Sequence, residues 1–282
     1  MQWQHAGVQA NGAAKPTIAA DAPLTATTLP NLSAELRRKV LAFLDEPTDD
    51  EAVRHTQEQT RISLQVVEEA LKRYKFEELS LSYNGGKDCL CLLVLLMACL
   101  PSLGPAGSKA TNGSTDAAAA VSAHPPVQAL YIAPTDPFPE VEEFVTTSTK
   151  EYHLDLMRYE LAMRPALEAY LDDRKSVKAV FMGTRRTDPH SEFLEHFSPT
   201  DKGWPQFMRI NPMIDWCYVD IWVFIRKLGI PYCSLYDLGY TSLGGTSNTK
   251  PNPKLAIGTE GAKFRPAYEL VKDEEERLGR AR

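Results

Sequence analysis

The sequence lacks the features that direct a chain into a membrane or through one. Among its 282 residues, no apolar run approaches the roughly 18 residues that a membrane-spanning helix needs. The first 16 residues contain no basic stretch followed by an apolar one, and no arginine precedes Arg37. Because secretory and mitochondrial targeting segments need those features, we expect a cytoplasmic protein with no membrane partner.

Cysteine is scarce and poorly spaced for cross-linking. The five cysteines are odd in number and include no CxxC pair (Cys89, Cys91, Cys99, Cys217, Cys233). This usage favours free thiols in a reducing compartment and argues against a disulfide framework or a zinc site. The first three lie in an apolar stretch, where cysteine behaves as a small core residue.

Positive charge is also in deficit, with a net charge of -6 and a pI of about 5.6. Such a chain has no general field for nucleic acid, so no nucleic-acid partner is expected. An anionic ligand would have to be held by a local cluster of cations.

What is present is an alternation of strands and helices. Helical spacing predicts helices over 33–45 and 61–75, and the stretch after them alternates between strand and helix patterns. The predicted strands are 79–83, 127–133, 154–160 and 177–183, and the helices between them are 88–100, 139–153 and 164–175. This order predicts an α/β fold, a parallel twisted sheet with helices on both faces.

The ends of the chain and one internal segment differ in composition. We expect residues 1–54 to be an N-terminal extension, partly disordered with a short helix, and 55–282 to be the functional domain. Residues 101–126 are rich in Pro, Gly, Ser and Ala, which predicts a long surface loop. After Gly183 the pattern becomes irregular, with one further helix over 219–229.

The stretch LSYNGGKDC, residues 81–89, joins a strand to a helix through two glycines. A strand–turn–helix of this kind directs backbone N–H groups and the positive helix end toward the turn, where an anion can bind. The P-loop pattern fails, because Leu81 stands where it needs Gly and Asp88 where it needs Ser or Thr. The GxGxxG dinucleotide motif is absent too. The remaining pattern, Ser-x-x-Gly-Gly-x-Asp, resembles the PP-loop of ATP pyrophosphatases.

Further motifs narrow the resemblance. In order, SYNGGKDC, YIAPTDPFPEVEEF, FMGTRRTDPHSEF, FSPTDKGWPQFMRINPMIDW, PYCSLYDLGYTSLGG and FRPAYELVKDEEERLGR resemble the eukaryotic FAD synthase (FMN adenylyltransferase) family, which is related to the PAPS reductases. The resemblance runs from Glu78 to Arg280 and excludes 101–126. No molybdopterin-binding-like domain precedes the motifs, so the chain resembles the single-domain form.

Two alternatives stay open on the sequence. A PAPS or APS reductase would need a cysteine nucleophile in its C-terminal tail, and no cysteine follows Cys233. A non-catalytic regulator that binds adenine nucleotides would not need Asp88 or the arginine motif.

The resemblance implies the reaction of FMN with MgATP to give FAD and pyrophosphate, with Mg²⁺ as cofactor, in a monomer. The PP-loop-like turn would bind ATP (Ser82, Tyr83, Asn84, Gly85, Gly86, Lys87, Asp88, together with Ile132). The later motifs would bind FMN (Gly183, Arg185, Arg186, Asp201, Trp204, Phe207, Arg209). The structural alternative for Trp204 and Phe207 is a place in the core.

Catalysis would fall to residues from the turn, the arginine motif and the tail (Asn84, Asp88, Asp188, Arg277, Arg280). Asp88 and Asp188 are the expected Mg²⁺ ligands, since magnesium usually takes one or two carboxylates. The alternative for Asp88 is a helix cap. Arg277 and Arg280 are three residues apart, so in a helical tail both would face the same side and could fold over the phosphates.

Overall fold

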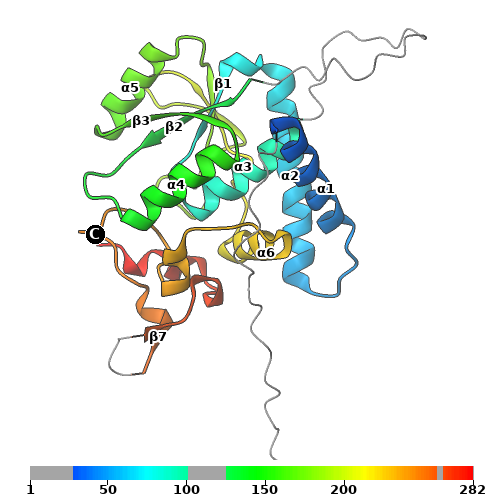
Figure 1. Ribbon diagram of the computed structural model, residues 1–282, viewed down its shortest axis with the longest axis vertical. Helices are drawn as coiled ribbons and strands as arrows, with labels where there is room; N and C mark the ends of the chain where they lie inside the picture. Colours follow the sequence, from blue (N-terminus) through cyan, green and yellow to red (C-terminus); the bar gives the residue numbers. More distant parts are fainter. Residues whose placement is uncertain (1–27, 101–124, 259–262, 282) are drawn as a thin grey trace, which may run out of the picture.

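The computed structural model describes residues 28–100, 125–258 and 263–281 (Figure 1). Its α-helices are α1 (Leu29–Asp45), α2 (Glu51–Arg73), α3 (Lys87–Cys99), α4 (Pro139–Glu151), α5 (Met163–Asp173) and α6 (Tyr218–Leu228). Its strands are β1 (Leu79–Ser82), β2 (Val127–Ile132), β3 (Leu154–Tyr159), β4 (Ala179–Phe181), β5 (Phe197–Pro199), β6 (Met208–Ile210), β7 (Ala256–Ile257) and β8 (Lys263–Phe264). Short 3₁₀-helices are η1 (Phe76–Glu78), η3 (Ser234–Leu238), η4 (Pro253–Leu255), η5 (Ala267–Glu269) and η6 (Asp273–Gly279).

Six strands form one mostly parallel sheet in the order β3-β2-β1-β4-β6-β5. Only the edge strand β5 is antiparallel, through its pairing with β6. The chain moves outward from β1 to β3 and then returns to add β4 on the other side of β1. Ligands of such sheets bind at this reversal of strand order, beyond the carboxyl ends of the strands. The predicted fold class is confirmed.

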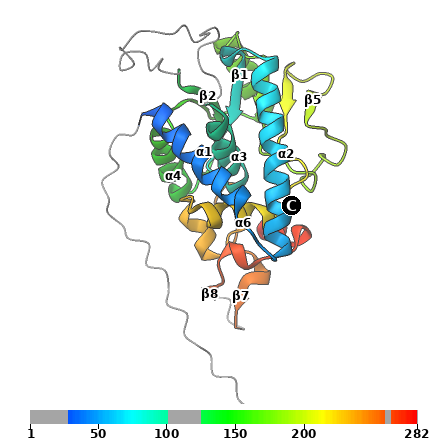
Figure 2. The same ribbon diagram turned by 90° about the vertical axis from the view of Figure 1, so that its right-hand side faces the viewer.

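Helices cover both faces of the sheet (Figures 1 and 2). Helix α5 packs on β2 and contributes Tyr170 to a core cluster with Leu130, Val180 and Phe207. Helix α3 occupies the other face and buries every residue except Asp88. A helix that is apolar all round needs cover on all sides, and α1, α2 and α6 supply it.

The first two helices belong to the packed structure. Asp50 caps α2 by accepting hydrogen bonds from the backbone N–H groups of Ala52 (2.9 Å) and Val53 (3.3 Å). Helix α2 therefore begins ten residues before the predicted helix 61–75, and the boundary expected between 54 and 55 lies inside it. The predicted disorder before residue 28 and most of the predicted loop 101–126 lie outside the described residues.

Four short strands after Gly183, β5 to β8, were not predicted. β5 and β6 form a hairpin whose connecting residues, 200–207, lead into the start of β6. Because β6 runs parallel to β4, with Met208 opposite Ala179, this hairpin turn lies at the amino-terminal edge of the sheet. Within the described part of the chain, no helix is both long and apolar enough to cross a bilayer.

Candidate active site

A cavity of about 710 Å³ opens at the carboxyl ends of β1, β2 and β4. Most of its lining comes from five segments: the glycine turn with the start of α3, the loop after β2, the loop after β3, the loop after β4, and the C-terminal tail with the 242–248 turn. The reversal point of the strand order therefore carries the largest concentration of predicted site residues.

The glycine turn is shaped by its neighbours. Gly85 has a φ of 71°, and a Cβ there would lie 2.8 Å from Cγ2 of Val145, so only glycine fits without strain. Asn84 Oδ1 accepts the N–H of Gly86 at 2.9 Å. The first N–H of α3, on Lys87, donates to the buried hydroxyl of Tyr236 at 2.8 Å. These contacts fix the helix start that faces the cavity.

A buried charge cluster lies under the turn. It consists of Lys87, Asp88, Arg185, Asp273 and Glu276. Lys87 Nζ is 2.9 Å from Asp88 Oδ2 and also contacts Glu276. Arg185 contacts Glu276 and lies 2.8 Å from Asp88 and 3.0 Å from Asp273. Two cations thus face three carboxylates, and both cations are 1% exposed.

The cluster controls the protonation of its members. Burial opposes the charge on Lys87, but Asp88 and Glu276 outweigh it and raise its pKa. Burial also opposes the charge on Asp88, and there Lys87 and Arg185 prevail and lower its pKa. Burial raises the pKa of Asp273. Lys87, Arg185 and Asp88 are therefore all charged at neutral pH.

The tail is attached by buried polar contacts. Thr241 donates its hydroxyl to the carbonyl of Glu276 at 2.6 Å. The fully buried amide of Asn252 donates to Thr241 Oγ1 at 2.9 Å and to the carbonyl of Glu275 at 2.7 Å. In Figure 1 the tail (red) lies beside the segments that follow α6 (orange). These bonds hold η6 against the segments that follow α6, and the pairing of Glu276 with Lys87 joins it to the glycine turn.

Two tail arginines reach the cavity. Arg277 and Arg280 both line it, from η6 and the residue after it. Arg280 is the extended residue that follows η6, with φ −95° and ψ 130°, so the two arginines meet at the cavity without sharing a helical face. Arg280 donates to the carbonyl of Leu243 at 2.8 Å, and burial lowers its pKa, with Arg277 adding to the effect.

The 242–248 turn lies against the side chain of Arg280. A side chain on Gly244 would collide with the Arg280 guanidinium. The turn is joined to the loop after β2 by Asp136, whose Oδ2 accepts the N–H of Ser247 at 2.6 Å. The side chain and N–H of Ser247 lower the pKa of Asp136.

The structure brings many predicted residues to the cavity wall, which is lined by Ser82, Asn84, Gly86, Lys87, Asp88, Ile132, Gly183, Asp188, Arg277 and Arg280. Gly183 lies against the start of α3, where a Cβ would be 2.9 Å from the N of Cys89. Asp188 Oδ2 accepts the N–H of Arg185 at 2.9 Å. Burial raises the pKa of Asp188, and the charge of Asp88 raises it further.

Other predicted residues lie elsewhere. Tyr83 is fully buried and donates its hydroxyl to Ser148 at 2.7 Å. Gly85 shapes the glycine turn but does not line the cavity. Arg185 is held by carboxylates, and Arg186 pairs with Asp215 at 2.6 Å on the surface.

The four flavin candidates lie on the β5–β6 hairpin, whose turn is at the edge of the sheet opposite the cavity (Asp201, Trp204, Phe207, Arg209). Phe207 is part of the α5-side core cluster, which is the structural alternative. Trp204 is 40% exposed, and Arg209 donates to the carbonyl of Pro199 at 2.8 Å. This arrangement gives no support to their predicted role in binding flavin.

Several residues that organise the site were not predicted from the sequence. They are Asp136, Tyr236, Thr241, Asn252, Asp273 and Glu276. Glu276 and Asp273 belong to the C-terminal tail, in which only Arg277 and Arg280 were predicted as site residues. Only the pairing of distant segments shows that they neutralise Lys87 and Arg185.

Comparisons with known proteins agree with this geometry. The family model for the phosphoadenosine phosphosulfate reductase domain matches residues 162–251. A probable FAD synthase of Schizosaccharomyces pombe is 40% identical over 224 residues, which cover 79% of each chain. A probable FAD synthase of Caenorhabditis elegans is 37% identical over 222 residues, or 77% of this chain and 39% of that one.

A crystal structure of Candida glabrata FMN adenylyltransferase in complex with FMN and an ATP analogue superposes with a TM-score of 0.80. It is 25% identical in sequence, and the match covers 91% of this chain and 98% of that one. The fold and enzyme class expected from the sequence are confirmed. The chain belongs to the FAD synthase family.

Proposed function

We propose that the cavity joins the AMP portion of ATP to FMN. A phosphate oxygen of FMN attacks the α-phosphorus of ATP, the bond to the β-phosphate breaks, and pyrophosphate leaves. The observation that carries this proposal is the meeting of the glycine turn with Arg277 and Arg280 in one cavity. Since the attacking group is already a phosphate oxygen, the site needs positioning and charge neutralisation rather than a protein nucleophile.

The wall of the cavity supports a requirement for Mg²⁺. It carries three cations (Lys87, Arg277, Arg280) and five carboxylates (Asp88, Asp136, Glu160, Asp188, Glu276). A wall with more carboxylates than cations repels two phosphorylated substrates unless additional positive charge enters with them.

Asp88 and Asp188 fit a magnesium ion. Both carboxylates line the cavity, and the charge of Asp88 raises the pKa of Asp188. Both oxygens of the Asp88 carboxylate face cations, Oδ1 at 2.8 Å from Arg185 Nε and Oδ2 at 2.9 Å from Lys87 Nζ, so a magnesium ion would share this carboxylate with them. Hard oxygen ligands of this kind are the ones that Mg²⁺ prefers. When bound, the ion would neutralise charge on the phosphates.

The tail arginines would act on the phosphates. Arg277 is exposed at the cavity, and its guanidinium makes no hydrogen bond or ion pair with the residues that the structure describes. It is therefore available for an anion, and a guanidinium binds phosphate with two parallel bonds. Arg280 is already oriented by Leu243. We assign to both the stabilisation of charge on the pyrophosphate leaving group.

The apolar part of the wall would accept the flavin ring. Pro137, Phe138, Leu161, Met182 and Leu243 give the cavity its apolar lining. A flat heterocycle needs such an apolar surface with a few polar groups at its edge. In this proposal Gly183, at the end of β4, lies next to the ring, as predicted. The flavin lies at the carboxyl edge of the sheet and away from the β5–β6 hairpin.

The proposal is tested by incubating the protein with FMN, ATP and Mg²⁺ and measuring FAD by chromatography. FAD and pyrophosphate should form in equal amounts, and riboflavin should not replace FMN. Arg277→Ala should lower the rate constant by about 10²- to 10³-fold, as removal of a donor to the charge that develops in the transition state typically does. Arg265→Ala is the matched control, because Arg265 pairs with Glu269 away from the cavity.

Formation of FAD without Mg²⁺, or an unchanged rate in Arg277→Ala, would contradict these assignments. Reduction of a sulfonucleotide in place of FAD synthesis would favour the reductase alternative. We also propose that the protein acts as a monomer in the cytoplasm, in keeping with its five free cysteines. Light scattering of the purified protein tests the monomer.

A further inference from the structure

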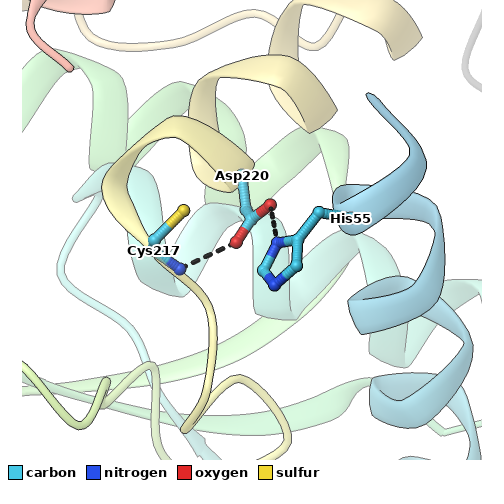
Figure 3. Close-up of side chains that lie close together, drawn as sticks. All are labelled: His55, Cys217 and Asp220. Atoms are coloured by element: carbon cyan, nitrogen blue, oxygen red, sulfur yellow. Dashed lines mark hydrogen bonds and ion pairs between the residues drawn. The ribbon is translucent and has the colours of Figure 1, made fainter. Parts of the chain in front are cut away.

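A second group of polar side chains lies where α2 meets the start of α6, outside the wall of the cavity (Figure 3). It consists of His55 from α2, Cys217, which is the N-cap of α6, and Asp220 from the first turn of α6. One nitrogen, one sulfur and one carboxylate oxygen from these residues lie within 4.8 Å of one another. The adenylyl transfer described above uses none of them.

The geometry around Asp220 is already organised. Its side chain is 1% exposed, and its Oδ1 lies 2.9 Å from Nδ1 of His55 and accepts the hydroxyl of Thr56 at 2.8 Å. Its Oδ2 accepts the N–H of Cys217 at 2.8 Å. The His55 side chain is 47% exposed. The carboxylate is therefore fixed in place, while the imidazole side of the group is open to solvent.

The mixture of donor atoms selects the class of cation. Sulfur and imidazole nitrogen together favour zinc and similar transition metals, whereas magnesium and calcium prefer oxygen alone. Three protein ligands beside an open side leave a fourth position for water, as in many three-ligand zinc sites.

Binding of a divalent ion changes the protonation of Cys217 and His55, and the charges of the resulting site balance. Cys217 binds a metal as the thiolate, so its thiol proton is lost on binding. When a divalent ion binds, that proton leaves to solvent, and the imidazole proton moves from Nδ1 to the other ring nitrogen. Figure 3 shows this second nitrogen directed away from Asp220. The ion, one thiolate and one carboxylate then sum to zero charge.

We propose that His55, Cys217 and Asp220 form a binding site for Zn²⁺, with water as the fourth ligand. The ion would join α2 to α6. The next residue, Tyr218, donates its N–H to Asp273 at 2.8 Å, and Asp273 pairs with Arg185. An ion at this junction would therefore also hold the end of α6 that supports the buried charge cluster.

The test measures metal binding rather than catalysis. Protein freed of metal by a chelator is titrated with Zn²⁺ in a calorimeter, and with Co²⁺ to look for thiolate-to-cobalt absorption. One ion per chain should bind, and the affinity should rise about tenfold per pH unit near neutrality, because one proton is released. Bound Zn²⁺ should also raise the melting temperature.

Variants separate this site from adventitious binding. His55→Gln and Cys217→Ser should each lower the Zn²⁺ affinity by about 100-fold or more, since each removes a direct ligand. His190→Asn is the control, because His190 is exposed elsewhere and has a φ of 64°, which Asn tolerates. Its affinity should equal that of the unmodified chain.

Thermal melting in the presence of chelator shows whether each variant is folded. If Cys217→Ser is unstable, His55→Gln still tests the site, because replacement of the half-exposed His55 should leave the fold intact. Absence of stoichiometric binding, or equal affinity in His55→Gln and the unmodified chain, would overturn the proposal. The three residues would then serve only as a hydrogen-bonded link between α2 and α6.

Discussion

The buried charge cluster makes a sharp prediction for Glu276→Gln. Glu276 contacts both Lys87 and Arg185, and its side chain is only 8% exposed. The substitution keeps the shape of the side chain and removes its charge. The amide oxygen can still accept one hydrogen bond, but the NH₂ group then faces a cationic donor.

The size of the expected loss in stability depends on which carboxylates Lys87 and Arg185 still contact after the substitution. Removing one partner of an isolated buried pair costs about 3–5 kcal/mol. Here Lys87 keeps Asp88 at 2.9 Å, and Arg185 keeps Asp273 at 3.0 Å. The formal charge of the cluster changes from −1, with two cations and three carboxylates, to zero. We therefore expect a loss nearer that of one charged hydrogen bond, about 2–3 kcal/mol.

The assay is urea unfolding followed by circular dichroism, with Glu274→Gln as control. Glu274 is exposed on the same 3₁₀-helix, so its change should stay within about 0.5 kcal/mol. The loss in Glu276→Gln should lower the melting temperature by about 4–12 °C, and salt should alter the loss little, because buried pairs are weakly screened. Equal stability of the two variants, or a loss that disappears in high salt, would refute the burial of the cluster.

Three further predictions concern the cavity wall. Gly244→Ala should displace the Arg280 guanidinium and lower the rate constant more than the melting temperature; parallel losses would show a structural role for the glycine instead. Hydrogen bonds from Ser247 lower the pKa of Asp136, so its contribution to stability is present above the ordinary carboxyl pKa of about 4 and is lost as the pH falls through the folded value. The melting-temperature difference between Asp136→Asn and the unmodified chain should therefore shrink in acid, and a constant difference would contradict this. Burial raises the pKa of Cys89 to about 12, so alkylating reagents at neutral pH should leave activity intact although this thiol lines the cavity; rapid inactivation traced to Cys89 by mass spectrometry would contradict that.

The sequence by itself determined the parallel sheet and the glycine turn. Alternating apolar segments and the residues Asn84 to Asp88 are local patterns, and the physics that makes them strand, turn or helix acts within a few residues. The order of the motifs identified the family, because each motif is a local pattern that can be recognised without knowledge of its tertiary contacts.

Only the tertiary structure decided which charges are free. Arg185 and Arg277 are alike in sequence, yet one is buried among three carboxylates and the other is exposed at the cavity. The position of the β5–β6 hairpin followed from the parallel pairing of β6 with β4, a contact that no local pattern reveals.

The same limit applies to the site proposed for Zn²⁺. The spacing of the cysteines argued against zinc, because that argument considers ligands close together in the chain. His55 and Asp220 are 165 positions apart and meet only because α2 packs against α6. The sequence gives the chemical type of each side chain. Its neighbours and its electrostatic environment depend on the packing of distant segments, which local patterns do not specify.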